Sequence, residues 1–384
     1  MTDLKIPVGI SDFAKIRNYQ YYYVDKTGLI EELLENETAE VTLITRPRRF
    51  GKTMGMSMLA NFFDIRKDSK AMFAGLEISK NAALCKEWMN QWPVVFLSFK
   101  NIDGDKFSLA YQQMVYEIGL LYDSYSELLT SNKLSEDDKA LFLQLKRRTA
   151  NEIDVLRSIQ FLLSLLYKHY GKTVILLLDE YDVPLAKSSA HGYYPEMLNV
   201  IKSMMTTSLK DNNTLRFAVI TGCLRIAKES IFTGTNNFVS DTISSSHLNE
   251  YFGFTQADVD QILKDADCME HADDIKNWYD GYHFGNLDVY CPWDVMNYLR
   301  DLQRNPKAKP ASYWKNTSDN SIIRSFIDYA GHSISRKLEI LLSGGYILQR
   351  IEENLTYDYL HSSEENLWSI LYLTGYLTQA REED

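Results

Sequence analysis

The stretch VTLITRPRRFGKTMGMSMLANFFD occupies residues 41–64. It opens with a short β-prone run, passes through a loop that contains Gly-Lys-Thr at residues 51–53, and continues into a helical run with no turn signal between them. In a strand, loop and helix of this layout, free backbone N–H groups at the helix N-terminus face an anion. The stretch therefore predicts a phosphate-binding loop (P-loop).

The usual P-loop pattern, G-x-x-x-x-G-K-[ST], lacks its first glycine here. Its last three letters match residues 51–53, but the first glycine position is occupied by Arg46. Pro47 offers a physical reason, because a proline pushes the preceding residue into an extended conformation and has a fixed φ of its own. Arg46 can thus end the strand and Pro47 can begin the loop. We expect nucleotide binding to survive this substitution.

Two further arginines, Arg48 and Arg49, add positive charge to the loop. They either assist phosphate binding or reach out to a partner. Lys52 supplies the main phosphate-binding charge, and Thr53 supplies a hydroxyl for Mg²⁺. The residues predicted to bind nucleotide are Pro47, Arg48, Arg49, Phe50, Gly51, Lys52, Thr53 and Met54.

A second signal lies at residues 172–180, where an apolar run ends in Asp179 and Glu180. Nucleoside triphosphate hydrolysis needs an acid to hold Mg²⁺ and a base to orient the attacking water. Asp179, at the end of the predicted strand, suits the metal together with Thr53. Glu180 points to the other side of the strand end and suits the water. Either motif alone is weak or moderate evidence, whereas the two in strand context are strong.

The next buried-type strand, residues 215–222, stops at a polar residue, Thr221. We expect Thr221 to sense the γ-phosphate, although it could simply end the strand. Arg225 could contact the phosphates, as a phosphate-sensing arginine or an arginine finger. The alternative is that it forms a surface salt bridge. Asp182 is predicted to have a structural role. Glu180, Thr221 and Arg225 are thus the predicted catalytic residues.

Short apolar runs alternate with helical segments over the first 250 residues, which predicts an α/β fold with a parallel sheet between helices. Residues 1–250 are assigned to this P-loop domain, and residues 251–384 to a mostly helical lid or winged-helix-like region. Tyr19–Val24 is β-prone and is expected to form a strand or turn before a helix; this segment either covers one edge of the core or closes over a bound base. The other predicted strands are 94–99, 239–243 and 287–291, and the helices include 107–129, 135–148, 151–170, 193–212, 254–263 (Thr255 as N-cap) and 293–303, with more from Asp319 onwards.

The composition is that of an ordinary globular chain of 384 residues, with 45% hydrophobic and 24% charged residues. The net charge of −11 argues against a chain that coats nucleic acid or an anionic membrane. Four widely spaced cysteines indicate free thiols rather than disulfides or a metal cluster. Because no signal peptide or membrane span is apparent, we expect a cytoplasmic protein.

These motifs resemble those of the bacterial AAA-ATPase-like proteins, in which Arg-Pro-Arg-Arg-Phe is the normal form of the loop. The resemblance implies a P-loop ATPase core with a helical lid, and ATP rather than GTP as the nucleotide. Many members continue into a PD-(D/E)XK nuclease-like domain, for which we expect no room before Asp384. The matching segments are 23–27, 46–53, 178–184, 221–225, 231–237, 251–255, 278–285 and 290–293.

The sequence thus favours Mg²⁺-dependent ATP binding and hydrolysis that drives a conformational switch. One alternative is a nucleotide-gated interaction module that does not hydrolyse ATP and scaffolds an assembly. Another is a regulatory ATPase of a nucleic-acid-acting system, for which Arg48, Arg49 and the basic cluster 146–148 give thin support. The identity of any protein partner, including a second copy of the chain, stays open.

Overall fold

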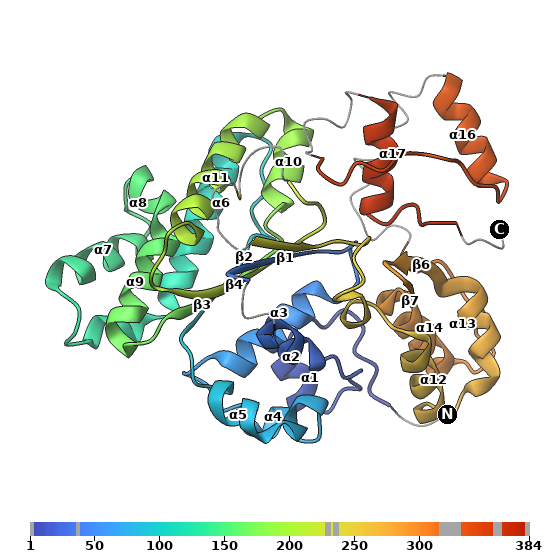
Figure 1. The fold of residues 1–384 in the computed structure, drawn as a ribbon, viewed down its shortest axis with the longest axis horizontal. Helices are drawn as coiled ribbons and strands as arrows, with labels where there is room; N and C mark the ends of the chain where they lie inside the picture. Colours follow the sequence, from blue (N-terminus) through green and yellow to red (C-terminus); the bar gives the residue numbers. More distant parts are fainter. Residues whose placement is uncertain are drawn as a thin grey trace.

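The computed structural model describes residues 4–35, 39–226, 232, 238–314, 332–355 and 363–380. Its centre is a five-stranded sheet with the order β2-β3-β4-β1-β5, in which every neighbouring pair is parallel (Figure 1). Strand β4 therefore lies between β1 and β3. The strands are β1 (Val41–Thr45), β2 (Val94–Ser98), β3 (Val174–Asp179), β4 (Leu215–Gly222) and β5 (Phe238–Asp241).

Helices cover both faces of this sheet, as predicted. Alternate residues of β3 enter opposite cores: Ile175 belongs to one cluster of buried side chains and Leu176 to the other. All residues of β3 are buried, which explains its continuous apolar sequence. One face carries α1 (Phe13–Asn18), α2 (Gly28–Glu35), α3 (Lys52–Phe63), α4 (Lys70–Phe73) and α5 (Ala82–Trp88); the other carries α6 (Phe107–Asp123), α7 (Glu136–Lys146), α8 (Glu152–Leu156), α9 (Ser158–Tyr170), α10 (Val183–His191) and α11 (Tyr194–Leu209).

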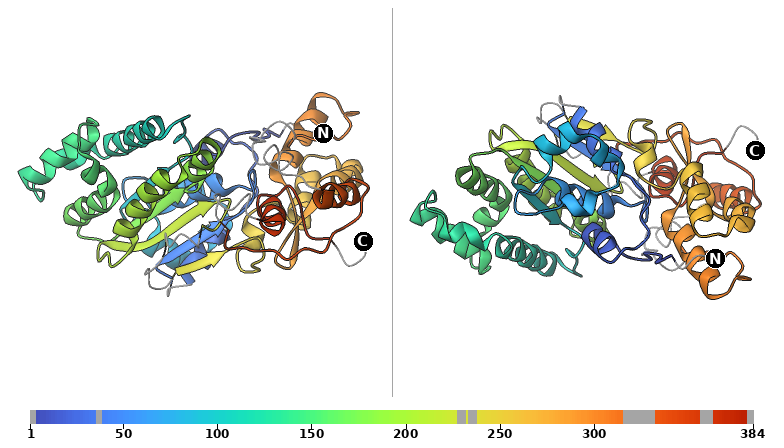
Figure 2. Two further views of the ribbon diagram at one scale, coloured as in Figure 1. Left: turned by 90° about the horizontal axis from the view of Figure 1, so that it is seen from above. Right: turned by 90° about the horizontal axis from the view of Figure 1, so that it is seen from below.

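The elements after β5 gather at one end of the sheet, as both views in Figure 2 show. They comprise an antiparallel hairpin and helices, in line with the predicted mostly helical region. A small separate core joins the last two helices. The elements are α12 (Gln256–Asp265), α13 (Ala272–Tyr279), β6 (Asp280–Phe284), β7 (Leu287–Tyr290), α14 (Pro292–Arg304), α16 (His332–Leu342) and α17 (Glu364–Leu373).

The first residues of the chain pack with this later region as well as with the sheet domain. The Tyr22 hydroxyl donates to Asp265 at 2.7 Å, and Lys26 Nζ lies 2.6 Å from Asp258 Oδ2. Leu4, Ile6, Val8, Tyr22 and Val24 pack against the core that α12 and α14 share. The domain boundary near residue 250 stays a prediction.

Most predicted elements are confirmed within a few residues, including two helix starts. Ser135 and Thr255 each form a capping box with the aspartate three residues on. Two predictions need correction. The helix expected over 107–129 ends at Asp123, and Ser126–Thr130 form a separate 3-10 helix. The helix expected over 151–170 is interrupted at Arg157, where α8 ends and α9 begins. Of the strand or turn expected at Tyr19–Val24, the structure has a turn at residues 19–20. Of the helices expected after Asp319, residues 319–331 lie outside the described ranges.

Arg46 follows β1 directly and is fully buried. Its guanidinium forms an ion pair with Asp241, the last residue of β5, and also donates to the Asp241 carbonyl at 3.1 Å. The guanidinium carbon lies 5.4 Å from the ring centroids of both Phe252 and Phe284. Burial lowers the pKa of Arg46, and the nearby Asp241 carboxylate opposes this effect. The residue at the first-glycine position therefore points into the protein, where it joins the sheet edge to the later region.

We predict that Asp241→Asn lowers the free energy of unfolding by about 3–5 kcal/mol, because it leaves the Arg46 charge buried without its partner. The double variant Arg46→Met, Asp241→Leu should lie within about 1 kcal/mol of the native chain, since a buried pair can be exchanged for apolar side chains. Urea unfolding measures both changes.

The matched control is Glu136→Gln, which breaks an exposed ion pair with Lys139 (Nζ to Oε1, 3.1 Å). Its expected effect is at most about 0.5 kcal/mol. An Asp241→Asn effect as small as that of the control would contradict the structural role of the buried pair.

Candidate functional site

Polar side chains from two adjacent strands and from the first turn of α3 meet at the carboxyl edge of the sheet, around Asp179. Asp179 is fully buried and accepts a hydrogen bond from the Thr221 hydroxyl at 2.6 Å (Oδ1). Its other oxygen accepts from the Thr53 hydroxyl at 2.9 Å. The strand order explains this meeting, since β4 places Thr221 between the loop after β1 and the end of β3. Three predicted site residues are thus brought together.

Helix α3 begins directly after Gly51, which has a φ of +87° that favours glycine. No side chain caps this end of the helix. The first N–H groups of a helix have no partner within the helix, so an uncapped start is suited to an anion such as a phosphate. This uncapped start agrees with the predicted phosphate-binding loop, and its ligand stays a prediction.

Lys52 is buried and folds back into the loop. Its ammonium donates to the carbonyl oxygens of Arg46 at 2.8 Å and Pro47 at 2.9 Å. The Cys223 sulfur lies 3.8 Å from the same nitrogen. The positive charge is thus held at the centre of the loop, next to the N-terminus of α3.

Glu180 turns the chain sharply after β3, with a φ of +54° that is uncommon outside glycine. Its N–H donates to Thr221 Oγ1 at 3.4 Å. Burial, followed by the adjacent Asp179 carboxylate, raises the pKa of Glu180, while the Lys52 charge opposes the rise. A carboxyl group with a raised pKa beside the phosphate loop is a candidate proton acceptor.

Asp182 and Tyr181 hold the loop that follows β4. Asp182 Oδ2 accepts hydrogen bonds from the backbone N–H groups of Cys223 and Leu224, each at 3.0 Å. The Tyr181 hydroxyl donates to the Leu224 carbonyl at 2.8 Å. A Cβ at Gly222 would lie only 2.7 Å from Asp182 Oδ1, so this approach requires glycine. These contacts give Asp182 the structural role that was predicted.

Three loop residues contact the region after residue 250. Phe50 is buried, and its ring centroid lies 4.8 Å from that of Tyr282 and 5.0 Å from that of Phe284. Arg49 lies over the indole of Trp293, and Pro47 lies against Gly375. The later region therefore braces the loop directly.

The remaining predicted site residues, Arg48, Met54 and Arg225, are not among the contacts around Asp179 and Lys52 described above. Arg48 is partly exposed, and Met54 is partly buried in the first turn of α3. Arg225 lies in the loop after β4, with its guanidinium carbon 6.0 Å from the ring centroid of Phe238. A role for Arg225 at a phosphate stays a prediction. Of the motif at residues 231–237, only Phe232 lies in the described part of the chain.

Sequence reasoning did not identify Ser98, Cys223 or Asp241 as neighbours of the site. Ser98 ends β2, and its hydroxyl lies 3.5 Å from Asp179 Oδ2. A polar residue at the end of an apolar strand is the signal that could have identified it. The sulfur of Cys223 near Lys52 carried no such signal, because its position depends on the sheet order.

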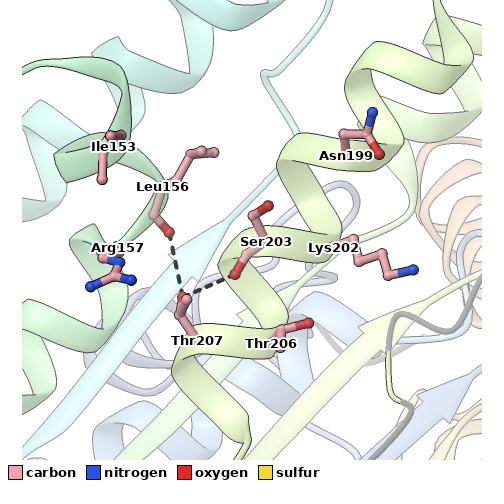
Figure 3. Close-up of a pocket in the computed structure, with 8 residues that line it drawn as sticks. All are labelled: Ile153, Leu156, Arg157, Asn199, Lys202, Ser203, Thr206 and Thr207. Atoms are coloured by element: carbon pink, nitrogen blue, oxygen red, sulfur yellow. Dashed lines mark hydrogen bonds between the residues drawn. The ribbon is translucent and has the colours of Figure 1, made fainter.

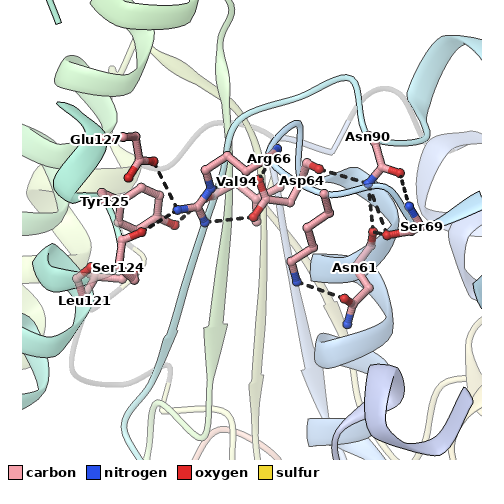
Figure 4. A network of polar contacts seen from close by, with 11 residues as sticks. Asn61, Asp64, Arg66, Ser69, Asn90, Val94, Leu121, Ser124, Tyr125 and Glu127 are labelled. Atoms are coloured by element: carbon pink, nitrogen blue, oxygen red, sulfur yellow. Dashed lines mark hydrogen bonds and ion pairs between the residues drawn. The ribbon is translucent and has the colours of Figure 1, made fainter. Parts of the chain in front are cut away.

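Two surface cavities lie away from this site. One, of about 430 Å³, lies between α8 and α11 and includes Arg157, Lys202 and Thr207 (Figure 3). Another, of about 420 Å³, adjoins the Arg66 network, where Arg66 pairs with Asp64 at 2.8 Å (Figure 4). That network lies near Val94, at the amino end of β2, where it connects the end of α3 to the residues after α6. The chemistry at Asp179, rather than a cavity volume, defines the candidate site.

Thr53 and Asp179 fit an Mg²⁺ site, since their paired oxygens are the hard ligands that this ion prefers. Mg²⁺ is commonly held by one or two carboxylates together with substrate phosphates and water, so a larger protein cage is not needed. Within the described ranges, no cluster of three or more His, Cys, Asp and Glu residues could hold a metal ion.

The four cysteines are free thiols, as predicted. Over the described residues, no helix combines the length and apolar character that crossing a membrane requires.

Comparison with known proteins agrees with the fold. The family model described as "Predicted AAA-ATPase" matches residues 7–232. An uncharacterized protein in the vnfD 5' region of Azotobacter chroococcum mcd 1 is 28% identical over 329 aligned residues, and the match covers 83% of this chain and 55% of the relative. The chain thus spans about half the length of that relative. No solved structure matches the chain. Because the family model covers more than half of the sequence, the chain belongs to the predicted AAA-ATPase family.

Proposed function

We propose that the protein binds ATP with Mg²⁺ at residues 47–54, hydrolyses it, and uses the cycle to drive a conformational switch. The observation that carries this proposal is the position of Asp179, whose two oxygens bond to Thr53 of the loop and Thr221 of β4. Family membership supports a nucleotide as the ligand.

The loop supplies phosphate binding through its backbone and Lys52. The N–H groups at the start of α3 face the phosphates, and the Lys52 ammonium neutralises their charge. In the structure, this ammonium bonds to two loop carbonyls. A phosphate oxygen, as a charged acceptor, would form the stronger hydrogen bond.

Thr53 and Asp179 would hold Mg²⁺, which when bound neutralises charge that develops on the phosphates. The Thr221 hydroxyl fixes the orientation of the Asp179 carboxylate through their 2.6 Å hydrogen bond. From the same position, Thr221 is suited to detect the γ-phosphate, as the sequence predicts.

Glu180 is the proposed base that orients the attacking water. Its deprotonated carboxylate accepts a hydrogen bond from the water, and its raised pKa makes it a better proton acceptor than an ordinary glutamate. The left-handed backbone of Glu180 is a strained feature of the kind that clusters at functional sites.

The switch follows from contacts on the far side of the loop. Phe50 and Arg46 contact Phe284 of the β6–β7 hairpin, while Lys52 and Thr53 face the phosphates. A change in loop geometry on phosphate binding would therefore shift Phe50 and Arg46 and, through their contacts with Phe284, the hairpin.

We expect Lys52→Ala to weaken ATP binding by about 100-fold, because a charged hydrogen-bond donor is lost. Glu180→Gln should keep ATP binding and lower kcat by about 10²–10⁴-fold, because the base is lost. Isothermal titration calorimetry measures binding, and phosphate release measures turnover. Normal turnover by the Glu180→Gln chain would contradict the assignment of the base.

The same assay separates the alternative functions. A native chain that binds ATP without releasing phosphate, alone or with DNA, would favour the interaction module that does not hydrolyse ATP. Phosphate release that rises with DNA would favour the regulatory role in a nucleic-acid-acting system.

The pH dependence of turnover provides an independent check on Glu180. Its pKa is raised in the free protein, so kcat/KM, which reports the free enzyme, should fall on acidification at a higher pH than an ordinary glutamate would give. The exposed Lys100 lowers the pKa of Glu180, so Lys100→Gln should move this acidic limb to higher pH. Added salt should reduce the difference between the native and Lys100→Gln profiles by screening the exposed charge.

Lys264→Gln is the control for this experiment, because Lys264 is exposed on α12 and is not among the groups that shift Glu180. Its pH profile should match that of the native chain. Coincident acidic limbs for native and Lys100→Gln proteins would argue against Glu180 as the titrating base.

A further inference from the structure

Arg49 belongs to the phosphate-binding loop but reaches away from it to another part of the chain. Its guanidinium carbon lies 3.9 Å from the ring centroid of Trp293, in the first turn of α14. The edge of the indole is also fixed, since Trp293 Nε1 donates to the Tyr313 carbonyl at 3.0 Å. Tryptophan offers the best aromatic face for a cation, and arginine is the cation found more often in such contacts. The contact therefore connects the loop to α14.

The backbone of Arg49 is unusual as well. Its φ of +75° lies in the left-handed region, which a residue with a side chain adopts only when the surrounding structure imposes it. Gly51, two residues on, also has a positive φ. The loop conformation that directs Arg49 towards Trp293 is thus held under strain by its contacts.

The charges around Arg49 come from both sides of the contact. Burial lowers the pKa of the guanidinium, as does the neighbouring Arg48, whereas Cys291, Asp294 and Glu180 act in the opposite direction. Asp294 is the neighbour of Trp293 on α14, and Glu180 is the proposed base. Arg49 therefore lies between the catalytic edge of the sheet and the start of α14.

A polyphosphate in the loop would compete with Trp293 for this guanidinium. Arginine binds phosphate through two parallel charged hydrogen bonds, which are stronger than its contact with an aromatic face. Arg49 is also close in sequence to Lys52 and to the N–H groups of α3 that face the phosphates. The exchange requires a change in the side chain and a local relaxation of the loop.

We propose that Arg49 is held on Trp293 when no phosphate is bound, and that the phosphates of a nucleotide draw it from Trp293 to themselves. The inference rests on the proposed function and deepens it: the contact between Arg49 and Trp293 is the one that changes in the later region when a nucleotide occupies the loop. Trp293 then loses a partner that ties α14 to the loop, while Phe50 and Arg46 keep the hairpin attached.

The test is ¹⁹F NMR on the full chain labelled with 5-fluorotryptophan, carrying Glu180→Gln to prevent hydrolysis, with Mg²⁺ present. Trp293→Phe assigns the Trp293 resonance, and the exposed Trp278 serves as an internal control. ATP and inorganic tripolyphosphate should both shift the Trp293 resonance, and adenosine should leave it unchanged. The Trp278 resonance should not move with any of the three.

Variants add a second readout through ATP affinity. Arg49→Gln should weaken binding by about 10- to 100-fold and give a Trp293 resonance that no longer responds to tripolyphosphate. Trp293→Leu removes the competing contact and should strengthen binding by about 2- to 5-fold. Arg148→Gln is the matched control, because Arg148 lies over Tyr116 at 4.3 Å on the surface away from the loop; it should change neither readout.

The outcomes separate this inference from the function on which it rests. ATP binding, detected by calorimetry, with an unmoved Trp293 resonance would overturn the exchange and leave the proposed function intact. A shift caused by adenosine alone would also overturn it, since the indole would then be a platform for the base. A failure of the chain to bind ATP at all would overturn both proposals.

Discussion

The buried ion pair between Arg46 and Asp241 is the constraint on which the loop depends. A buried guanidinium is tolerated only with a charged partner, so the end of β5 must lie beside the end of β1. Phe252 and Phe284 enclose the same charge, which draws the later region onto the sheet edge. The residue that replaces the first glycine of the loop thus fixes three parts of the chain relative to one another, and its side chain stays clear of the phosphate side.

The sheet order supplies the second constraint. Because β4 lies between β1 and β3, the hydroxyls of Thr221 on β4 and of Thr53 after β1 both reach a single carboxylate, Asp179. The adjacency of β3 and β4 also positions the loop after β4, where Asp182 accepts hydrogen bonds from two backbone N–H groups. A buried polar network of this kind is stable because its members satisfy one another, and it holds the site geometry before any ligand arrives.

The sequence predicted those features that depend on local patterns. Residues 51–53 and the apolar run that ends at Asp179 identified the loop and the acid, and Pro47 explained why Arg46 could end a strand. The partner of Arg46 could not be predicted, because Asp241 is a neighbour only once the order of the strands is known. The stacking of Arg49 on Trp293 joins residues far apart in the chain, and no local pattern indicates it. The 3-10 helix after Asp123 was missed because its apolar spacing continues that of α6.

The N-terminal segment packs against helices that are made much later. Gln303 Nε2 donates to the Leu4 carbonyl at 2.6 Å, and Tyr22 bonds to Asp265. During synthesis, these first residues cannot form these contacts until α14 has left the ribosome. Contacts between residues so distant in the chain carry a large loop-closure cost and form late in folding. The N-terminal segment therefore completes these contacts only after translation has passed residue 304, and the contact of Pro47 with Gly375 forms later still.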